Sequence, residues 1–264
     1  MELNNSIPII LEAIRKVGTG FLKDYKQKAI PENIEELTAS LAAIDTICLS
    51  SLKADLAKNF PNAPWQIGDE FDTESQRNPV IGSDYWLCDA MDGAIQYLQH
   101  IAGWTINLVL VRDGQPCFSV IFDPLANEMF WAQAGVGAFM NNKPLMPAKK
   151  TDLSVMLAVF EYGHEDKSTN NLNDIIGESV TELIKTFGIV RNYGPHGLQL
   201  AYVGAGRIDF FIQHDLDTYN WIAGILIAKE AGAEILTTAG NPWQWGSDSL
   251  LVTTKSTAIK FLNK

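Results

Sequence analysis

The chain is poor in cysteine and in basic residues. Its 264 residues include only three cysteines, Cys48, Cys88 and Cys117, an odd number without a C-x-x-C pair. This spacing excludes a disulfide framework and is typical of reduced, buried cysteines. Lysine and arginine total 20 against 31 aspartates and glutamates, which gives a formal net charge of −11. Such an acidic surface disfavours nucleic acid and anionic lipid as partners.

Long apolar runs are also missing. The longest, around residues 104–111, is far shorter than the ~20 residues that a membrane-spanning helix needs. The amino terminus lacks the basic start and the apolar run of a signal peptide. Hydrophobic residues make up 47% of the chain and charged residues 19%, the composition of an ordinary globular protein. We therefore expect a cytoplasmic protein of one large domain or two smaller ones, without a membrane partner.

The first half of the chain changes from helical to strand periodicity. Apolar residues recur every three or four positions and predict two long amphipathic helices, at residues 10–28 and 34–56. Short aromatic and apolar runs then predict strands at residues 65–67, 85–88, 105–112, 116–122 and 128–132. Two helices followed by an antiparallel run of strands predict an α+β domain at residues 1–149, which carries most of the candidate metal ligands.

The second half alternates between strands and helices, after a linker rich in proline and lysine near residues 144–152. Strands are predicted at residues 155–160, 189–192, 208–213, 234–237 and 249–254. Helices are predicted at residues 171–187, 196–205 and 218–231. Alternation of this kind is α/β in character, so we expect residues 150–264 to form a second domain that completes the site.

The strongest local signal is the stretch W-L-C-D-A-M-D-G at residues 86–93. A hydrophobic strand runs there into two acids, Asp89 and Asp92, and then into a glycine. Two carboxylates held together without a neighbouring lysine or arginine repel each other, and a divalent cation relieves the repulsion. Taken alone, the two acids and the glycine would also suit a capped turn or a surface loop.

Further acids favour a cation site. Asp69 and Glu70 follow the strand predicted at residues 65–67, and Asp45 lies within the apolar second helix. An unpaired acid in such a place costs free energy, although the edge of the helix's polar face would also explain Asp45. Three acidic groups favour Mg²⁺, with Mn²⁺ as the alternative ion. A helix opening at Ala94 would turn its free N–H groups toward the same point and favour a phosphate.

Four motifs occur in one order along the chain. Trp86, Asp89, Asp92 and Gly93 match the pattern W-x-x-D-P-[IL]-D-G-T. Y-N-W-I-A-G at residues 219–224 and E-A-G-A at 230–233 are similar to W-D-x-x-A-G followed by E-A-G-G. A-G-R-I-D at 205–209 resembles A-x-G-R-x-D, and G-D-E at 68–70 stands where the pattern has G-E-E. Over nearly its whole length the chain therefore resembles the inositol monophosphatases, Mg²⁺-dependent and lithium-sensitive phosphatases.

The resemblance implies a fold, a reaction and a set of ligands. The fold is a layered α-β-α-β-α sandwich, usually a homodimer, and the reaction is hydrolysis of a phosphomonoester by a metal-activated water. One Mg²⁺ would be held by Asp69, Asp89 and the backbone carbonyl of Met91, and a second by Asp89, Asp92 and Asn220. Asp45 would help to orient the water. Phosphate and substrate contacts would come from Asp92, Gly93, Ala94, His196, Gln213 and Asn220.

The chain departs from the family pattern at the chemistry itself. Asn220 replaces an aspartate, which removes one negative charge from the second ion's ligands and weakens its binding. Ala94 replaces a threonine whose hydroxyl positions the water. Asp69 is one methylene shorter than the family glutamate, and Glu70 takes its role in an alternative register. Gln213 replaces a glutamate that contacts substrate.

His196 stands where the family has a small residue beside the polyol pocket. Its imidazole would reshape that pocket and favours a substrate other than inositol phosphate, although a lone histidine is more often structural. One hypothesis is a phosphomonoesterase acting on a small phosphorylated polyol, sugar or nucleotide. The alternative is a catalytically impaired relative that binds a phosphorylated ligand or a protein partner. A binding role in RNA complexes is disfavoured by the net charge of −11.

Overall fold

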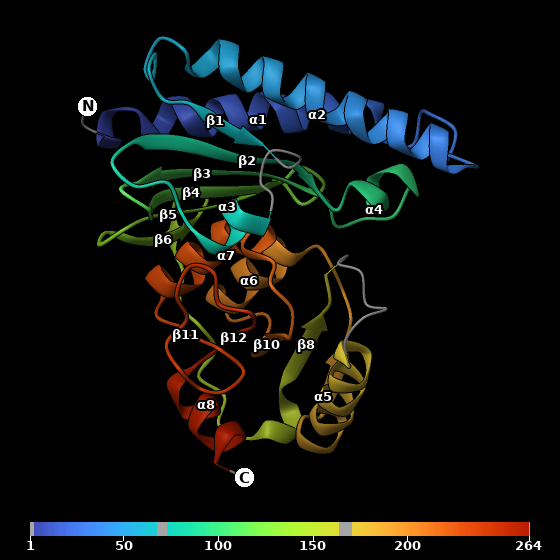
Figure 1. The fold of residues 1–264 in the computed structure, drawn as a ribbon, viewed down its shortest axis with the longest axis vertical. Helices are drawn as coiled ribbons and strands as arrows, with labels where there is room; N and C mark the ends of the chain where they lie inside the picture. The colour runs from blue at the N-terminus through green and yellow to red at the C-terminus, as the bar shows by residue number, and fades with distance from the viewer. Residues whose placement is uncertain (1–2, 68–72, 164–170, 264) are drawn as a thin grey trace.

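Three layers of helices and two sheets alternate through the protein, as its computed structural model shows (Figure 1). The structure describes residues 3–67, 73–163 and 171–263. The layers run from α1 and α2, through the first sheet, to α6 and α7, and then through the second sheet to α5 and α8. This order is the α-β-α-β-α sandwich predicted from the sequence.

The first helical layer is formed by α1 (Ile7–Asp24) and α2 (Ile34–Leu56). Pro8 stands in the first turn of α1, where its missing N–H costs nothing. The side chain of Asn33 begins α2 by accepting a hydrogen bond from the N–H of Glu36 at 2.9 Å. Both helices turn an apolar stripe to the first sheet, so this layer covers one face of the sheet that carries Asp89 and Asp92.

Helix α2 is longer and more apolar than the segment at residues 104–111, which the sequence analysis gave as the longest apolar run. By length and composition alone it is the one described helix that would suffice to cross a membrane, with a mean hydropathy of 1.3. The stretch at residues 104–111 is therefore not the longest apolar segment. Ile44, Cys48, Leu52 and Leu56 of α2 are buried against the sheet and α1, which accounts for part of this apolar content.

The first sheet has seven strands in sequence order. They are β1 (Trp65–Ile67), β2 (Asp84–Asp92), β3 (Thr105–Arg112), β4 (Gln115–Asp123), β5 (Glu128–Gln133), β6 (Gly137–Met140) and β7 (Lys143–Pro144). All neighbours are antiparallel except β1 and β2, which are parallel. The predicted run of antiparallel strands is thus wrong at this pair, because the connection that contains α3 (Thr73–Arg77) crosses over and returns the chain in the same direction.

The second sheet has the order β11-β12-β10-β8-β9. Its strands are β8 (Leu157–Glu161), β9 (Ile189–Arg191), β10 (Phe210–Gln213), β11 (Glu234–Leu236) and β12 (Leu250–Thr253). Between the two sheets lie α6 (His196–Gly204) and α7 (Thr218–Ala231), and beyond the second sheet lie α5 (Leu172–Thr186) and α8 (Lys255–Leu262). Short 3-10 turns occur at Leu3–Asn5 and Leu153–Val155.

Four apolar clusters fill the four interfaces between these five layers. The second cluster joins Val109 and Phe130 of the first sheet to Leu198 of α6 and Ile222 of α7. Helices from the carboxyl half of the chain therefore cover a sheet from the amino half. This packing brings the starts of α6 and α7 to the end of β2, while the division at residue 150 stays a prediction.

Candidate active site

Asp89 and Asp92 lie close together near the carboxyl end of β2. Strand residues three apart normally point to opposite faces, because side chains alternate along a strand. Here Asp89 lies opposite Asn107 of β3 and Asp92 lies opposite Thr105, so β2 contains one extra residue between them. A bulge of this kind re-aims a side chain. It turns both carboxylates toward the same face of the sheet.

Asp92 is held by two hydrogen bonds. Its Oδ2 accepts from the N–H of Gly197 at 2.8 Å and from Nδ2 of Asn107 at 3.1 Å. The hydroxyl of Thr105 donates to Oδ1 of Asn107 at 2.8 Å and so orients the amide. Burial raises the pKa of Asp92 to about 6, although the charge of His196 and the two hydrogen bonds lower it. These bonds use Oδ2 and leave Oδ1 for a ligand.

Asp89 carries a buried oxygen, Oδ2, that has no hydrogen-bond partner among the described residues. Burial raises the pKa of Asp89 well above its usual range, and the charge of Asp92 raises it further. An ionised carboxylate is costly in such surroundings. A divalent cation would supply both the missing partner and the missing positive charge.

Gly93 links these carboxylates to α4 (Ala94–Leu98), a helix that begins where the sequence indicated. The φ of Gly93 is +86°, and a Cβ at this position would lie 2.6 Å from the carbonyl oxygen of Gly103. Only glycine satisfies both conditions. The helix has only five residues, so the expected anion site at its start receives little support from a helix dipole.

A group of hydrogen-bonded side chains lies where α6 and α7 begin. Asp217 accepts from Nδ2 of Asn220 at 2.7 Å and from Nε2 of Gln213 at 3.1 Å. Nε2 of His196 lies 3.5 Å from the same carboxylate. Burial raises the pKa of Asp217, whereas the charge of His196 lowers it. Because Asn220 uses its nitrogen in this way, its side-chain oxygen is the atom available to a cation.

Asp217 occupies the N-cap position of α7, but its carboxylate makes no hydrogen bond to the helix backbone. The hydroxyl of Tyr219, two residues later, donates to the backbone carbonyl of Cys88. The start of α7 is therefore tied to β2 immediately before Asp89.

The carboxylates and the helix starts line one cavity of about 580 Å³. The cavity brings together seven of the residues predicted for the site: Asp89, Met91, Asp92, Gly93, Ala94, His196 and Asn220. Asp69 and Glu70, predicted as a ligand and its alternative, lie outside the described residues. Within the described residues no group of three His, Cys, Asp or Glu side chains is arranged to hold a metal ion.

Gln213 does not line this cavity, contrary to its predicted contact with substrate. Its side chain is fully buried. The amide nitrogen donates to Asp217, and the amide oxygen accepts from Nε1 of Trp221 at 2.8 Å. Both ends of the amide are therefore used inside the core.

Asp45 was first interpreted as an acid among the apolar residues of the second helix, and the structure does not place it there. It is exposed on α2 and does not occupy the buried stripe of the helix. The edge of the polar face, the alternative weighed from the sequence, is thus the correct placement. Its negative charge still raises the pKa of Asp89, so it lies near the site without lining the cavity.

Glu161 is a cavity residue that the sequence analysis missed. It is 7% exposed at the end of β8. Its carboxylate accepts from the N–H of Gly194 at 2.8 Å, from Nε2 of Gln199 at 2.6 Å and from Nδ2 of Asn192 at 3.0 Å. An acid at the end of a predicted strand, the same signal that singled out Asp89, would have identified it. The other lining residues not predicted are Leu41, Ile95, Gln96, Tyr162, Asn192, Tyr193, Gly194 and Pro195.

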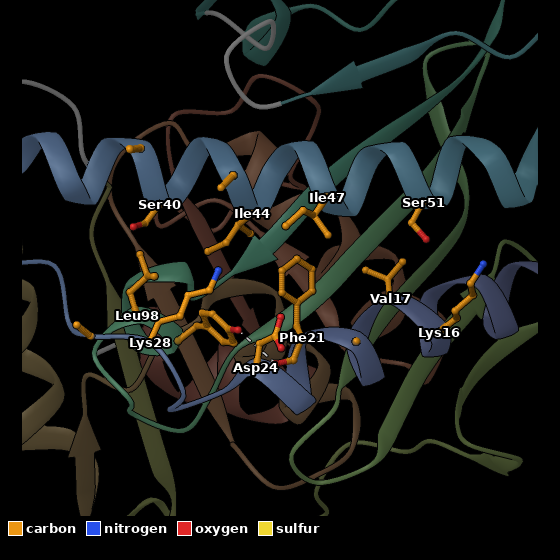
Figure 2. A pocket seen from close by; sticks show the side chains of 15 residues that line it. Lys16, Val17, Phe21, Asp24, Lys28, Ser40, Ile44, Ile47, Ser51 and Leu98 are labelled. Carbon is orange, nitrogen blue, oxygen red and sulfur yellow. Dashed lines mark hydrogen bonds between the residues drawn. The ribbon is translucent and has the colours of Figure 1, made fainter.

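Another cavity, of about 450 Å³, lies between α1 and α2 (Figure 2). Phe21 and Asp24 of α1 face Ser40 and Ile47 of α2 across it. The hydroxyl of Tyr97 donates to the carbonyl oxygen of Phe21 at 3.3 Å and connects α4 to this layer. No residue predicted for the site lines this cavity, so the candidate site is the cavity at the end of β2.

Comparison with known proteins identifies the family. A model of the inositol monophosphatase family matches residues 3–264. The chain belongs to the inositol monophosphatase family. It is 31% identical over 234 residues to the inositol-1-monophosphatase of Mesorhizobium japonicum, which covers 85% of this chain and 82% of that protein. It is 25% identical over 231 residues to the Nus factor SuhB of Xylella fastidiosa, which covers 87% and 81%.

Solved structures of this family share the fold. The IMPase of Thermotoga maritima has a TM-score of 0.78 at 20% identity and covers 98% of this chain and 97% of that chain. The extragenic suppressor protein suhB of Bartonella henselae has a TM-score of 0.79 at 21% identity, with the same coverage. The layered architecture is therefore that of the inositol monophosphatase family.

Proposed function

We propose that this chain is a Mg²⁺-dependent phosphomonoesterase that releases phosphate from a small phosphorylated polyol, sugar or nucleotide. The observation that carries the proposal is the pair Asp89 and Asp92, which a bulge turns to one face at a cavity and which includes a buried oxygen without a partner. Membership of the inositol monophosphatase family supports the reaction class.

The donors at the site suit Mg²⁺, which prefers oxygen ligands, and they also suit Mn²⁺. Asp89, the backbone carbonyl of Met91 and Asp69 would hold one ion. Asp89, Asp92 and the side-chain oxygen of Asn220 would hold a second, more weakly because Asn220 is neutral. When bound, such ions activate water and neutralise charge on the phosphoryl group.

The protein's own side chains would position the substrate. Asp92 is fixed by Gly197 and Asn107, so the orientation of its free oxygen is set before any ligand binds. The imidazole of His196 lines the cavity, and its Nε2 lies 3.5 Å from the carboxylate of Asp217. This side chain narrows the space for the group that carries the phosphate, so we expect a substrate choice different from that of an enzyme with a small residue there.

Loss of catalysis is the second candidate. Three substitutions favour it: Asn220 supplies no charge to the second ion, Ala94 supplies no hydroxyl for the water, and Asp69 is one methylene shorter than the family glutamate. In that case the cavity binds a phosphorylated ligand, or the protein binds a partner, without turnover. The carboxylate pair that a first ion requires is nevertheless present, which is why catalysis is the preferred proposal.

Phosphate release tests the proposal. The native chain would be assayed with Mg²⁺ and with Mn²⁺ against a panel of phosphomonoesters, beside Asp89→Ala. Asp84→Ala is a matched control, because Asp84 lies at the other end of β2 and pairs with Arg112 at 2.9 Å, away from the cavity. We expect release by the native chain and by Asp84→Ala, and none by Asp89→Ala.

Two other outcomes separate the candidates. A silent native chain that gains activity as the double variant Asn220→Asp, Ala94→Thr would identify an impaired relative disabled at the metal ligands. Equal release by the native chain and Asp89→Ala would refute a role for the carboxylate pair.

We also propose that the protein is cytoplasmic, as expected from its sequence, and that it is a homodimer, as its resemblance to the family implies. Light scattering coupled to size exclusion should give twice the chain mass of 29.2 kDa. A mass equal to that of one chain would contradict the dimer.

A further inference from the structure

The side chain of Asn220 is the last member of a series of hydrogen bonds that begins in the core. The series runs from Trp221 through Gln213 and Asp217 to Asn220, which lines the cavity at the end of β2. Trp221 and Gln213 are fully buried, and Asp217 is 6% exposed. A buried network whose members are satisfied by one another is held in one arrangement. The direction of each bond therefore decides which atom of Asn220 faces the cavity.

Trp221 sets the direction of the first two bonds. An indole nitrogen can only donate, so the side-chain oxygen of Gln213 must accept from Nε1 of Trp221, at 2.8 Å. The nitrogen of the same amide is thereby turned to Asp217 and donates to its Oδ2 at 3.1 Å. A glutamate at position 213 would have no hydrogen to donate there when ionised. Gln213 thus fixes the carboxylate of Asp217 as an acceptor.

Asp217 sets the direction of the last bond. An ionised carboxylate only accepts hydrogen bonds, so the nitrogen of Asn220 must turn to Oδ1 of Asp217, at 2.7 Å. The oxygen of Asn220 is the other branch of the amide and is left for the cavity. Asp217 does not itself line the cavity, and both of its oxygens already accept from Asn220 and Gln213. It can therefore act on a cation through Asn220 but not as a ligand.

The contact between Asp217 and Asn220 also places a negative charge directly behind a neutral ligand. Partners of this kind orient a metal ligand and make it a stronger electron donor. Asn220 needs such a partner, because its amide carries no charge of its own to attract a second ion.

On the basis of the function proposed above, we propose that Asp217 is a positioning residue for the second cation. It holds the amide of Asn220 with the oxygen toward the cavity, and it supplies from behind this ligand the negative charge that Asn220 lacks. Gln213 contributes by holding Asp217, which explains why its side chain is used in the core and not at the substrate.

Calorimetric titration of Mg²⁺ and of Mn²⁺ tests the proposal, together with urea unfolding in the presence of a chelator. The variants are Asp217→Asn, Asn220→Asp and the exchange that combines both substitutions and so keeps one acid and one amide. Asp215→Asn is the matched control. Asp215 is also a buried aspartate and lies two residues before Asp217, but its carboxylate accepts from the N–H of Gly163.

We expect Asp217→Asn to raise the dissociation constant of the weaker ion at least about tenfold, which corresponds to about 1.4 kcal/mol. The oxygen of the new amide must accept from Gln213, so its nitrogen turns to Asn220 and reverses that amide, whose nitrogen then faces the cavity. The dissociation constant of the tighter ion should change much less. Asp215→Asn should leave the constant of the weaker ion close to the native value.

The exchange separates this contact from a general loss of charge. Without metal, Asn220→Asp alone places two carboxylates in contact and should lower the urea midpoint of unfolding. The exchange removes one of the two acids and should raise the midpoint again, a non-additive result typical of residues in contact. It should also bind the weaker ion at least as tightly as the native chain, because the negative charge then lies on the ligand itself.

The inference is overturned if Asp217→Asn binds the weaker ion as the native chain does, or if Asp215→Asn weakens this ion equally. It is overturned as well if the exchange is no more stable than Asn220→Asp without metal. A native chain that binds a single ion would refute the role of Asn220 and Asp217 while leaving the proposed function with one ion at Asp89. Absence of any binding to the native chain would count against the proposed function, and the urea midpoints would still decide whether Asp217 holds Asn220.

Discussion

Asp92→Asn tests the free-energy cost of burying the Asp92 carboxylate, which a bound cation would offset. In the chain without divalent metal, Asp92 has a pKa of about 6 instead of its ordinary value of 3.8. At 1.36 kcal/mol for each pKa unit, this difference corresponds to about 3 kcal/mol. The amide keeps an oxygen that accepts from Gly197 and Asn107. We therefore expect the variant to be more stable than the native chain at neutral pH by up to ~3 kcal/mol.

The gain has a defined pH dependence. A carboxyl whose pKa is raised by folding holds its proton more tightly in the folded chain, so its contribution to stability is greatest below pH 3.8 and is lost as the pH rises through about 6. The difference in free energy of unfolding between Asp92→Asn and the native chain should grow as the pH rises from 3.8 to about 6 and stay constant at higher pH. Saturating Mg²⁺ should narrow the difference, because the native chain binds the ion more tightly.

Urea unfolding in the presence of a chelator, repeated at several pH values, gives the required free energies. Asp84→Asn, at the other end of β2, is the matched control, because its carboxylate pairs with Arg112 at the surface and lies away from the cavity. An Asp92→Asn chain that is less stable than the native chain at neutral pH would refute the reasoning. A difference that is the same at every pH would refute it as well.

Three further substitutions test single features. A Cβ at Gly93 would lie 2.6 Å from a carbonyl oxygen, so Gly93→Ala should lower the urea midpoint of unfolding. Gly135→Ala is the control and should lower the midpoint less, because φ is also positive there at +74° but nothing lies within 4 Å of the added Cβ. An equal loss in both variants would contradict the contact at Gly93. Gln213→Glu places a second carboxylate beside Asp217 in the core and should lower the free energy of unfolding by about 3 kcal/mol at neutral pH. A stable Gln213→Glu chain with increased activity would instead place this side chain at the substrate. Burial lowers the pKa of His214, so the unfolded chain binds this proton more tightly and stability falls as the pH drops below the ordinary value of 6.5. His214→Asn should flatten that part of the unfolding profile, and an unaltered profile would show that this histidine is not its source.

The long elements of the fold follow from periodicity, whereas short edge elements do not. The helix predicted at residues 34–56 coincides with α2, because Asn33 caps its start and its apolar stripe is continuous. Helix α1 starts three residues earlier than predicted, since Pro8 fits its first turn. Strands β6 and β7 and helices α3 and α8 were not predicted. They are short, and tertiary packing decides their conformation more than local pattern does.

The site was predictable where its residues are neighbours in sequence. Asp89, Asp92 and Gly93 form one motif, although the bulge that aligns the two carboxylates has no visible signal in the sequence. Glu161 and Tyr193 come from distant segments and join the site only through the order of strands in the second sheet.

Gln213 was predicted to contact substrate but does not line the cavity. A position that matches the family pattern does not establish where its side chain points. The residue lies beside Glu161 in the register of β10 and β8. Its amide is nevertheless taken by Trp221 and Asp217 in the core. Strand pairing therefore places the backbone near the site, while side-chain packing directs the amide away from the cavity.

Whether Asp89 and Asp92 form a divalent cation site is tested most directly by calorimetric titration of Mg²⁺ into the native chain, Asp89→Ala and Asp84→Ala. The structure predicts saturable binding to the native chain and to Asp84→Ala, and its loss in Asp89→Ala, because only Asp89 presents a buried oxygen without a partner among the described residues at this cavity. Binding of equal strength and stoichiometry in all three chains, or no binding to the native chain, would contradict a cation site at the end of β2.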